Sequence, residues 1–204
     1  MSETLGQAVS KLVQTYQEFR LPGIFAPANA EQLSVIKQKL DLPPSLIEWY
    51  SIASPQNVEI PTRSLNLVLN NSDYLNEALI GYRTDAITGE ELSDWDSTWL
   101  VMGGEGEHPI IIPTNSADDT KIYYAEPTEV AWELKMLSLD LEGFLLGIID
   151  YINLYVGQYK QQIHKEDERL RPEFVADFEI ALDQRSSTTG RSQMWLGGLF
   201  GYWI

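Results

Sequence analysis

Apolar residues recur every three or four positions through the first twenty residues, which predicts an amphipathic helix. The residues that share this spacing are Leu5, Val9, Leu12, Val13, Tyr16 and Phe19. After a Pro/Gly-rich break, Asn29 stands where its side chain can cap a second helix, whose apolar positions are Leu33, Ile36 and Leu40. The segment LPPSLIEWYSIASP predicts a third, short helix, because Pro44 is tolerated in a first turn and Pro55 follows its end.

The middle of the chain changes to short β-branched and aromatic runs bounded by turn residues, which predicts strands. These runs are LNLVL (65–69), TWLVM (98–102), PIIIPT (109–114) and KIYYA (121–125). The loops GGEGEH and NSADDT are too short for helical crossovers, so we expect an antiparallel meander. The continuous isoleucines at 110–112 indicate a sheet that is largely covered on both faces. Between 70 and 97 we expect a short helix capped by Ser72 and a polar loop with a Thr88-Gly89 turn.

A long helix is expected from about Ser138 to Ile163. Asp140 and Glu142 fall in its first turn, where acidic side chains suit the positive end of the helix dipole. This helix includes the most apolar stretch of the chain, 143–157. A membrane span needs about 20 apolar residues, and this stretch is shorter and contains charge, so we interpret it as a buried core helix.

One more helix and an apolar arm are predicted at the carboxyl-terminal end. The helix begins at Pro172 and carries Phe174, Val175, Phe178 and Leu182. Residues 185–192 are expected to form a flexible link, and the uncharged tail 194–204 to fold back as a strand or packed arm. Helices, then antiparallel strands, then helices make an α+β fold. We expect the 204 residues to form a single domain.

Charge is the most informative property of the composition. Thirty acidic and fourteen basic residues give a net charge of −16, and Asp73–Glu142 alone contains sixteen acids and three bases, a net of −13. Nucleic-acid binding is not expected, because it requires clustered Lys and Arg. The absence of cysteine excludes disulfides, thiolate metal sites and a cysteine nucleophile. The amino terminus has no signal-peptide pattern, so we expect a cytoplasmic location and no membrane partner.

The order of these segments resembles that of the SUKH superfamily, the Smi/Knr-like proteins, over about residues 29–152. In that family a helix leads into an LP-containing motif, which is followed by a hairpin of a Trp-led strand, a Gly/Asp turn and an isoleucine-rich strand. A strand with a Val-Tyr motif and a closing helix come next. The matching positions here are Leu42, Pro43, Leu46, Trp49, Tyr50, Trp99, Leu100, Gly104, Ile110, Ile111, Ile112, Ile122, Tyr123, Ser138, Leu139, Phe144 and Leu145. The chain departs from the family pattern at SPQN (54–57), Glu107-His108 and Lys121, and residues 155–204 form an extension without a counterpart.

The resemblance implies a fold of the SUKH type and a protein that works by binding another protein, without catalytic residues or cofactors. Bacterial members of the family are immunity proteins that capture toxin domains, many of which are nucleases. The resemblance therefore implies that this chain neutralises a basic, cytosol-acting toxin by direct binding. Fungal members act as regulatory scaffolds, which is the alternative role within the binding class.

The acidic segment supplies the candidate partner-binding residues. Five acids surround a tryptophan in the loop DAITGEELSDWDS, as in an interface hot spot with an aromatic anchor inside a charged rim. These residues, extended by the acids of the two hairpin loops, are Asp85, Glu90, Glu91, Asp94, Trp95, Asp96, Glu105, Glu107, Asp118 and Asp119. Two alternatives stay open: the acids serve only to keep the protein in solution, and Trp95 lies in the core.

Catalytic and metal-binding chemistry has weaker support in the sequence. Glu105, Glu107 and His108 are possible metal ligands, but no second histidine stands at ligand spacing, which favours a solvated hairpin tip. No G-x-S-x-G turn presents a serine, and no Lys-Ser/Thr follows Gly103-Gly104. A small hydrolase that uses carboxylates near Glu105 and Glu107 is the alternative from another class. We expect no enzyme activity, no metal and no cofactor.

Overall fold

The computed structural model describes residues 4–62, 66–106, 108–114, 121–129, 131–167, 169–184 and 194–199. The fold is α+β, as the sequence predicts. Its helices are α1 (Leu5–Phe19), α2 (Ala30–Lys39), α3 (Pro44–Ala53), α4 (Leu141–Ile152), α5 (Pro172–Asp183), the 3-10 helix η1 (Glu77–Leu79) and the π-helical turns η2 (Asn153–Gln158) and η3 (Met194–Leu199). Its strands are β1 (Ile24–Ala26), β2 (Ser54–Gln56), β3 (Val58–Pro61), β4 (Asn66–Leu69), β5 (Trp99–Glu105), β6 (His108–Pro113), β7 (Ile122–Pro127) and β8 (Trp132–Ser138).

The amino-terminal helices begin where the sequence predicts. A capping box opens α1, in which the Thr4 amide donates to Gln7 Oε1 at 2.8 Å. The expected cap of α2 is confirmed, since the Glu31 amide donates to Asn29 Oδ1 at 2.7 Å. Pro44 is the first residue of α3. Proline is tolerated there because the N–H group of a first helical residue has no partner within the helix.

The strands form the predicted antiparallel meander, in the order β3-β4-β5-β6-β7-β8, and β1 pairs with β2 in a separate ribbon. Residues 110–112 are fully buried, which confirms a sheet covered on both faces at that strand. The loop predicted at GGEGEH is shorter than expected. Gly103–Glu105 belong to β5, and the chain turns at Gly106, which has a φ of 57°. The NSADDT loop lies outside the described residues, and β1, β2, β3 and β8 are not predicted.

The helix after the sheet is shorter than expected. Ser138 ends β8, Asp140 caps α4 by accepting from the Gly143 amide at 2.6 Å, and the helical path ends with η2 rather than at Ile163. Residues 143–149 are buried, so the prediction of a core helix is confirmed. The expected capping role of Ser72 is wrong, because η1 begins five residues later and the Ser72 amide instead donates to Ser54 Oγ at 3.2 Å.

The carboxyl-terminal tail packs into the core as the π-helical turn η3. Trp195 is fully buried, stacks on Phe144 with ring centroids 5.5 Å apart, and donates from Nε1 to the Leu137 carbonyl at 3.2 Å. The packed arm is confirmed at the buried residues Trp195 and Leu196, and the strand alternative is wrong because 194–199 are helical. Residues 185–193 and 200–204 lie outside the described residues. No helix in the described part of the chain has the length and apolar character needed to cross a bilayer.

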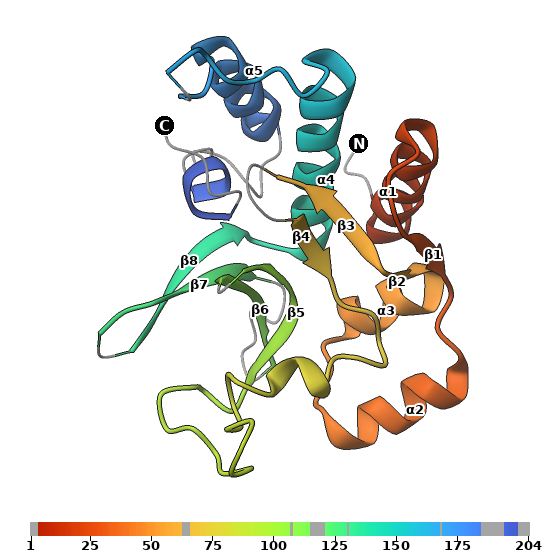
Figure 1. The fold of residues 1–204 in the computed structure, drawn as a ribbon. Coiled ribbons are helices and arrows are strands. Elements are labelled where there is room, and N and C mark those ends of the chain that lie inside the picture. The colour runs from red at the N-terminus through yellow and green to blue at the C-terminus, as the bar shows by residue number, and fades with distance from the viewer. Residues whose placement is uncertain are drawn as a thin grey trace.

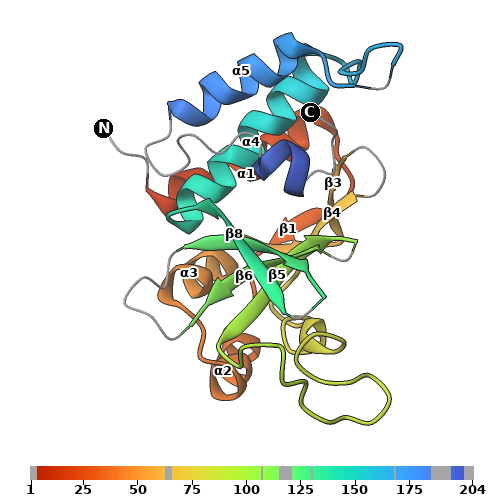
Figure 2. The same cartoon turned by 90° about the vertical axis from the view of Figure 1, so that its left-hand side faces the viewer.

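The sheet lies between two groups of helices. Figures 1 and 2 agree in placing α4 and α5 at one end of the molecule and α2 with the 70–97 segment at the other. Tyr151 of α4 ties the helices to the sheet, since its hydroxyl donates to the Pro61 carbonyl at 3.0 Å. On the other side, the Tyr50 hydroxyl donates to the Asn70 carbonyl at 3.0 Å and holds α3 against the start of the 70–97 segment. This segment carries most of the candidate residues.

Candidate functional site

Residues 83–96, named the acidic loop here, form an internally hydrogen-bonded structure. The Asp85 amide donates to the Glu90 carbonyl and the Leu92 amide to the Arg83 carbonyl, both at 2.8 Å. At the tip, Asp85 Oδ1 accepts from the amides of Thr88 (2.7 Å) and Ile87 (2.8 Å), and these two bonds lower the pKa of Asp85. The predicted Thr88-Gly89 turn is confirmed, since Gly89 has φ of 73°. The loop is therefore held in one conformation by its own contacts.

Trp95 anchors the acidic loop by packing against aromatic residues of the sheet and of the preceding segment. Its side chain is 5% exposed, and its ring centroid lies 5.1 Å from Tyr82, 5.3 Å from Trp99 and 5.4 Å from Trp132. Its Nε1 donates to the Trp99 carbonyl at 3.4 Å. Trp95 lies in the core, as one of the two alternatives had it, because the aromatic rings of Tyr82, Trp99 and Trp132 cover its indole. Trp95 orients the loop and is not itself an exposed anchor.

The five acids of the loop differ in their surroundings. Asp85 and Asp96 hold turns, Asp96 Oδ1 accepting from the Thr98 amide at 2.9 Å. Glu91 lies 3.5 Å from Arg83 in a partly exposed ion pair. Within the described part of the chain, the exposed carboxylates of Glu90 and Asp94 have no hydrogen-bonded or ionic partner. These two carboxylates are therefore available to pair with a binding partner.

Glu105 departs from the expectation of a solvated hairpin tip. It is 6% exposed, and Oε1 accepts a hydrogen bond from Thr62 Oγ1 at 2.9 Å. The cause is that β5 continues through Glu105, so the residue belongs to the paired sheet and its carboxylate lies against Thr62. Glu107, Asp118 and Asp119 lie outside the described residues. Among the described residues no group of three His, Asp or Glu side chains is placed to hold a metal ion.

A groove of about 310 Å³ runs over β4 and β5 beside the acidic loop, and we name it the β4–β5 groove. Its floor is sheet backbone at Gly103 and Gly104, where the strands approach so closely that a Cβ on Gly103 would collide with the Val68 carbonyl oxygen. Its walls carry exposed apolar side chains, Val68 of β4 with Tyr74 and Ile80 from the segment around η1. The groove is thus open, mostly apolar and built on a rigid sheet.

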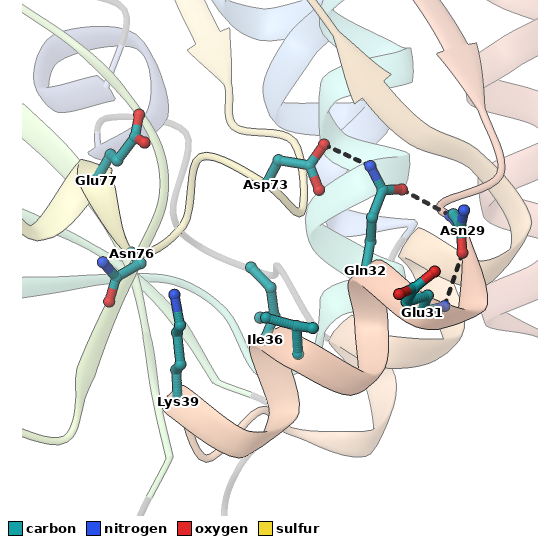
Figure 3. Close-up of a pocket in the computed structure, with 9 residues that line it drawn as sticks. Asn29, Glu31, Gln32, Ile36, Lys39, Asp73, Asn76 and Glu77 are labelled. Atoms are coloured by element: carbon teal, nitrogen blue, oxygen red, sulfur yellow. Dashed lines mark hydrogen bonds between the residues drawn. The ribbon is translucent and has the colours of Figure 1, made fainter.

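A second groove, of about 370 Å³, separates α2 from the segment around η1, and we name it the α2–η1 groove (Figure 3). Gln32 connects its two sides, because Nε2 donates to Asp73 Oδ2 at 2.9 Å while Oε1 accepts from the Asn29 amide at 3.0 Å. Three carboxylates line the groove against one cation; the charged residues are Glu31, Asp73, Glu77 and Lys39. The groove therefore carries a net negative charge.

The two grooves meet at Glu77, which lines both of them. Sequence reasoning missed this arrangement, because α2 and η1 are about forty residues apart and only the folded chain brings Gln32 to Asp73. One signal was present: Tyr74 and Ile80 are large apolar residues that fit neither the helical nor the strand pattern around them. The 70–97 segment, which contains the acidic loop and η1, lies at the same end of the molecule as α2 (Figure 1).

Comparisons of the chain with family models, with curated proteins and with solved structures found no match.

Proposed function

We propose that the chain is a protein-binding module of the SUKH type, an immunity protein that neutralises a basic, cytosol-acting toxin by direct binding. The observation that carries the proposal is where exposed apolar side chains gather. Five of the nine large apolar residues that are exposed in the described part of the chain lie in the two grooves or at the tip of the acidic loop. These five are Val35, Val68, Tyr74, Ile80 and Ile87.

Apolar side chains inside a polar rim match the anatomy of protein interfaces. Ile87 is 94% exposed at the loop tip, with Glu90 on the same loop. Acidic residues that serve only solubility do not require exposed apolar side chains beside them. The presence of both kinds of residue therefore favours a docking surface. The resemblance to the SUKH family, whose bacterial members bind toxins, supports the same role.

The charge of this surface favours a basic partner. A negative surface accelerates encounter with a positive protein, raising association rates from about 10⁵–10⁶ to about 10⁸–10⁹ M⁻¹s⁻¹ at low salt. A nuclease holds phosphates with Lys and Arg, so an acidic protein can occupy that same positive surface. Speed benefits an inhibitor that has to capture its target before damage occurs. The net charge of −13 between residues 73 and 142 fits this role.

The order of the acidic loop supports tight binding. Ordering a loop on association lowers affinity, and rigid loops avoid that loss. Here the turn at Asp85 and the aromatic cluster around Trp95 order the loop in the unbound protein. A regulatory scaffold would use the same surface, whereas the hydrolase alternative draws less support because Glu105 is buried and bonded to Thr62.

A protection assay tests the proposal. Cells that express the toxin domain encoded beside this gene should survive when the chain is co-expressed, and the two proteins should co-purify. Reversing two unpartnered charges together, Glu90→Lys with Asp94→Lys, should weaken protection, because it places positive charge against a positive partner. As a control for position, Glu18→Lys changes one exposed acid of α1, a helix that lies away from α2 (Figures 1 and 2). Absence of both protection and binding for every neighbouring gene product would reject the immunity role.

A further inference from the structure

Glu77 lines both the apolar β4–β5 groove and the acidic α2–η1 groove. A site for an apolar side chain and a site for a cation are therefore adjacent. In the β4–β5 groove, Tyr74 and Ile80 flank η1 and leave much of their apolar surface in water. Exposed apolar area of this kind favours association, at about 25 cal/mol for each Å² that is buried. A flexible surface would lose part of this gain through ordering, but here the groove floor is paired sheet backbone.

The α2–η1 groove contains carboxylates that can accept further hydrogen bonds or ion pairs. Asp73 accepts a hydrogen bond from Gln32, but within the described residues Glu31 and Glu77 have no side-chain partner. In Figure 3, Glu77 and Asp73 stand on one wall and Glu31 on α2 opposite. Lys39 is the cation of this groove, so the carboxylates outnumber it three to one. A Lys or Arg side chain of a partner would relieve this excess of negative charge.

We propose that these two grooves are the anchor site for the basic partner, and that the partner inserts a segment in which an apolar side chain is adjacent to Lys or Arg. The apolar side chain occupies the β4–β5 groove against Tyr74 and Ile80, and the cation pairs with Glu77. The inference rests on the proposed function and deepens it, since it names the docking site and the chemistry of the segment that is recognised. The acidic loop then steers the encounter, while the grooves hold the bound partner.

Binding of a catalytically inactive form of the neighbouring toxin domain, measured as a dissociation constant, tests the site. Ile80→Asp should raise the dissociation constant by about thirtyfold or more, because loss of a hot-spot contact exceeds about 2 kcal/mol and 1.4 kcal/mol corresponds to about tenfold. The matched control is Ile180→Asp on α5, since Ile180 is 57% exposed and Ile80 is 53% exposed. The control variant should bind within about threefold of wild type, because it changes an exposed isoleucine outside both grooves.

Glu77→Lys tests the charged half, with Glu18→Lys as the control of equal charge change. Glu77→Lys should weaken binding by more than about tenfold at low salt, and the difference should shrink at high salt because ionic screening weakens charge pairs. Hydrogen exchange of the unmodified complex gives a readout that needs no variant: binding should protect the amides of residues 74–80. If a variant is less stable, Ile80→Ser serves as a milder change at the same position.

The results separate this inference from the proposed function. If wild type binds the toxin domain while Ile80→Asp and Glu77→Lys bind like their controls and residues 74–80 gain no protection, the anchor site is wrong and the immunity role stands. If the wild-type chain binds no neighbouring gene product, the immunity role and the anchor site are overturned together.

Discussion

Replacing Gly147 by alanine tests whether the carboxyl-terminal turn η3 is part of the core. Gly147 lies in the middle of α4 against the buried indole of Trp195. A Cβ at this position would lie 2.7 Å from Trp195 Cη2 and 2.8 Å from Cζ2, whereas carbon atoms pack at about 3.5–4.0 Å. The indole would have to move by about an ångström, away from Phe144 and from its hydrogen bond to the Leu137 carbonyl.

The size of the effect follows from two destabilising contributions and one stabilising contribution. Overpacking a tight core destabilises by about 1–3 kcal/mol, and loss of the indole hydrogen bond adds about 1 kcal/mol. Alanine favours the helical conformation more than glycine does, and this offsets about 1 kcal/mol of the loss. We therefore expect Gly147→Ala to lower the free energy of unfolding by about 1–3 kcal/mol.

Gly6→Ala is the matched control, because Gly6 is also in a helix but a Cβ there would meet no close contact. The nearest atoms to its added Cβ are Ile52 Cδ1 at 3.5 Å and Glu48 Oε1 at 4.0 Å, which are ordinary contacts. This variant should be unchanged or more stable by less than about 1 kcal/mol. Urea unfolding followed by circular dichroism gives both free energies, provided that the slope with denaturant stays the same.

A double variant identifies the cause. Gly147→Ala combined with Trp195→Phe should lose less than the sum of the two single losses, with a coupling of about 0.5–3 kcal/mol, since the smaller ring leaves room for the methyl group. If Gly147→Ala is as stable as Gly6→Ala, or if the two changes simply add, Trp195 does not pack on α4 and the reasoning is refuted.

Three further predictions concern the acidic loop and the carboxyl-terminal helices. Trp95→Ala should lower the free energy of urea unfolding by about 3–5 kcal/mol, since it removes the centre of the aromatic cluster, and a loss below about 1 kcal/mol would contradict the proposed anchoring of the loop. Backbone hydrogen bonds from Thr88 and Ile87 lower the pKa of Asp85, so loop order should persist below the ordinary aspartate pKa of about 3.9 and be lost as pH falls through the lowered value. Nuclear magnetic resonance of these two amides measures the midpoint, and a value above about 4 would be inconsistent with the capping role. Burial, followed by the 2.7 Å hydrogen bond to Asp177, raises the pKa of Tyr159 to about 12, so its stabilising contribution should be complete below about pH 10 and be lost as pH rises through about 12. The tyrosinate absorbance that Tyr159→Phe removes should appear near that pH, and an ordinary titration near 10 would contradict the contact.

Elements with strong local signals could be predicted from the sequence. Asn29 and Pro172 mark the starts of α2 and α5 because a side-chain cap and an N-terminal proline act within one turn of the helix. The isoleucines at 110–112 predict a buried strand for a similarly local reason. The strand β8 was missed because Glu133 and Lys135 interrupt its apolar run, and they are tolerated there since β8 is at the edge of the sheet.

The candidate site depends on contacts that local patterns do not contain. The acids of the loop are visible in the sequence, but the burial of Trp95 results from Tyr82, Trp99 and Trp132 converging in the fold. The helical form of η3 likewise depends on the space that Gly147 leaves for Trp195. The two grooves arise where α2 faces η1 and where η1 faces the sheet, so they appear only in the tertiary structure.

The central claim is that an acidic docking surface captures a positively charged protein, and the salt dependence of association tests it most directly. The association rate constant with the inactive toxin domain can be measured by stopped-flow fluorescence from about 20 mM to about 500 mM salt. We expect the rate constant to fall by more than about tenfold over this range while dissociation changes much less, because screening acts mainly on the encounter. An association rate constant that stays the same at every salt concentration would contradict the claim.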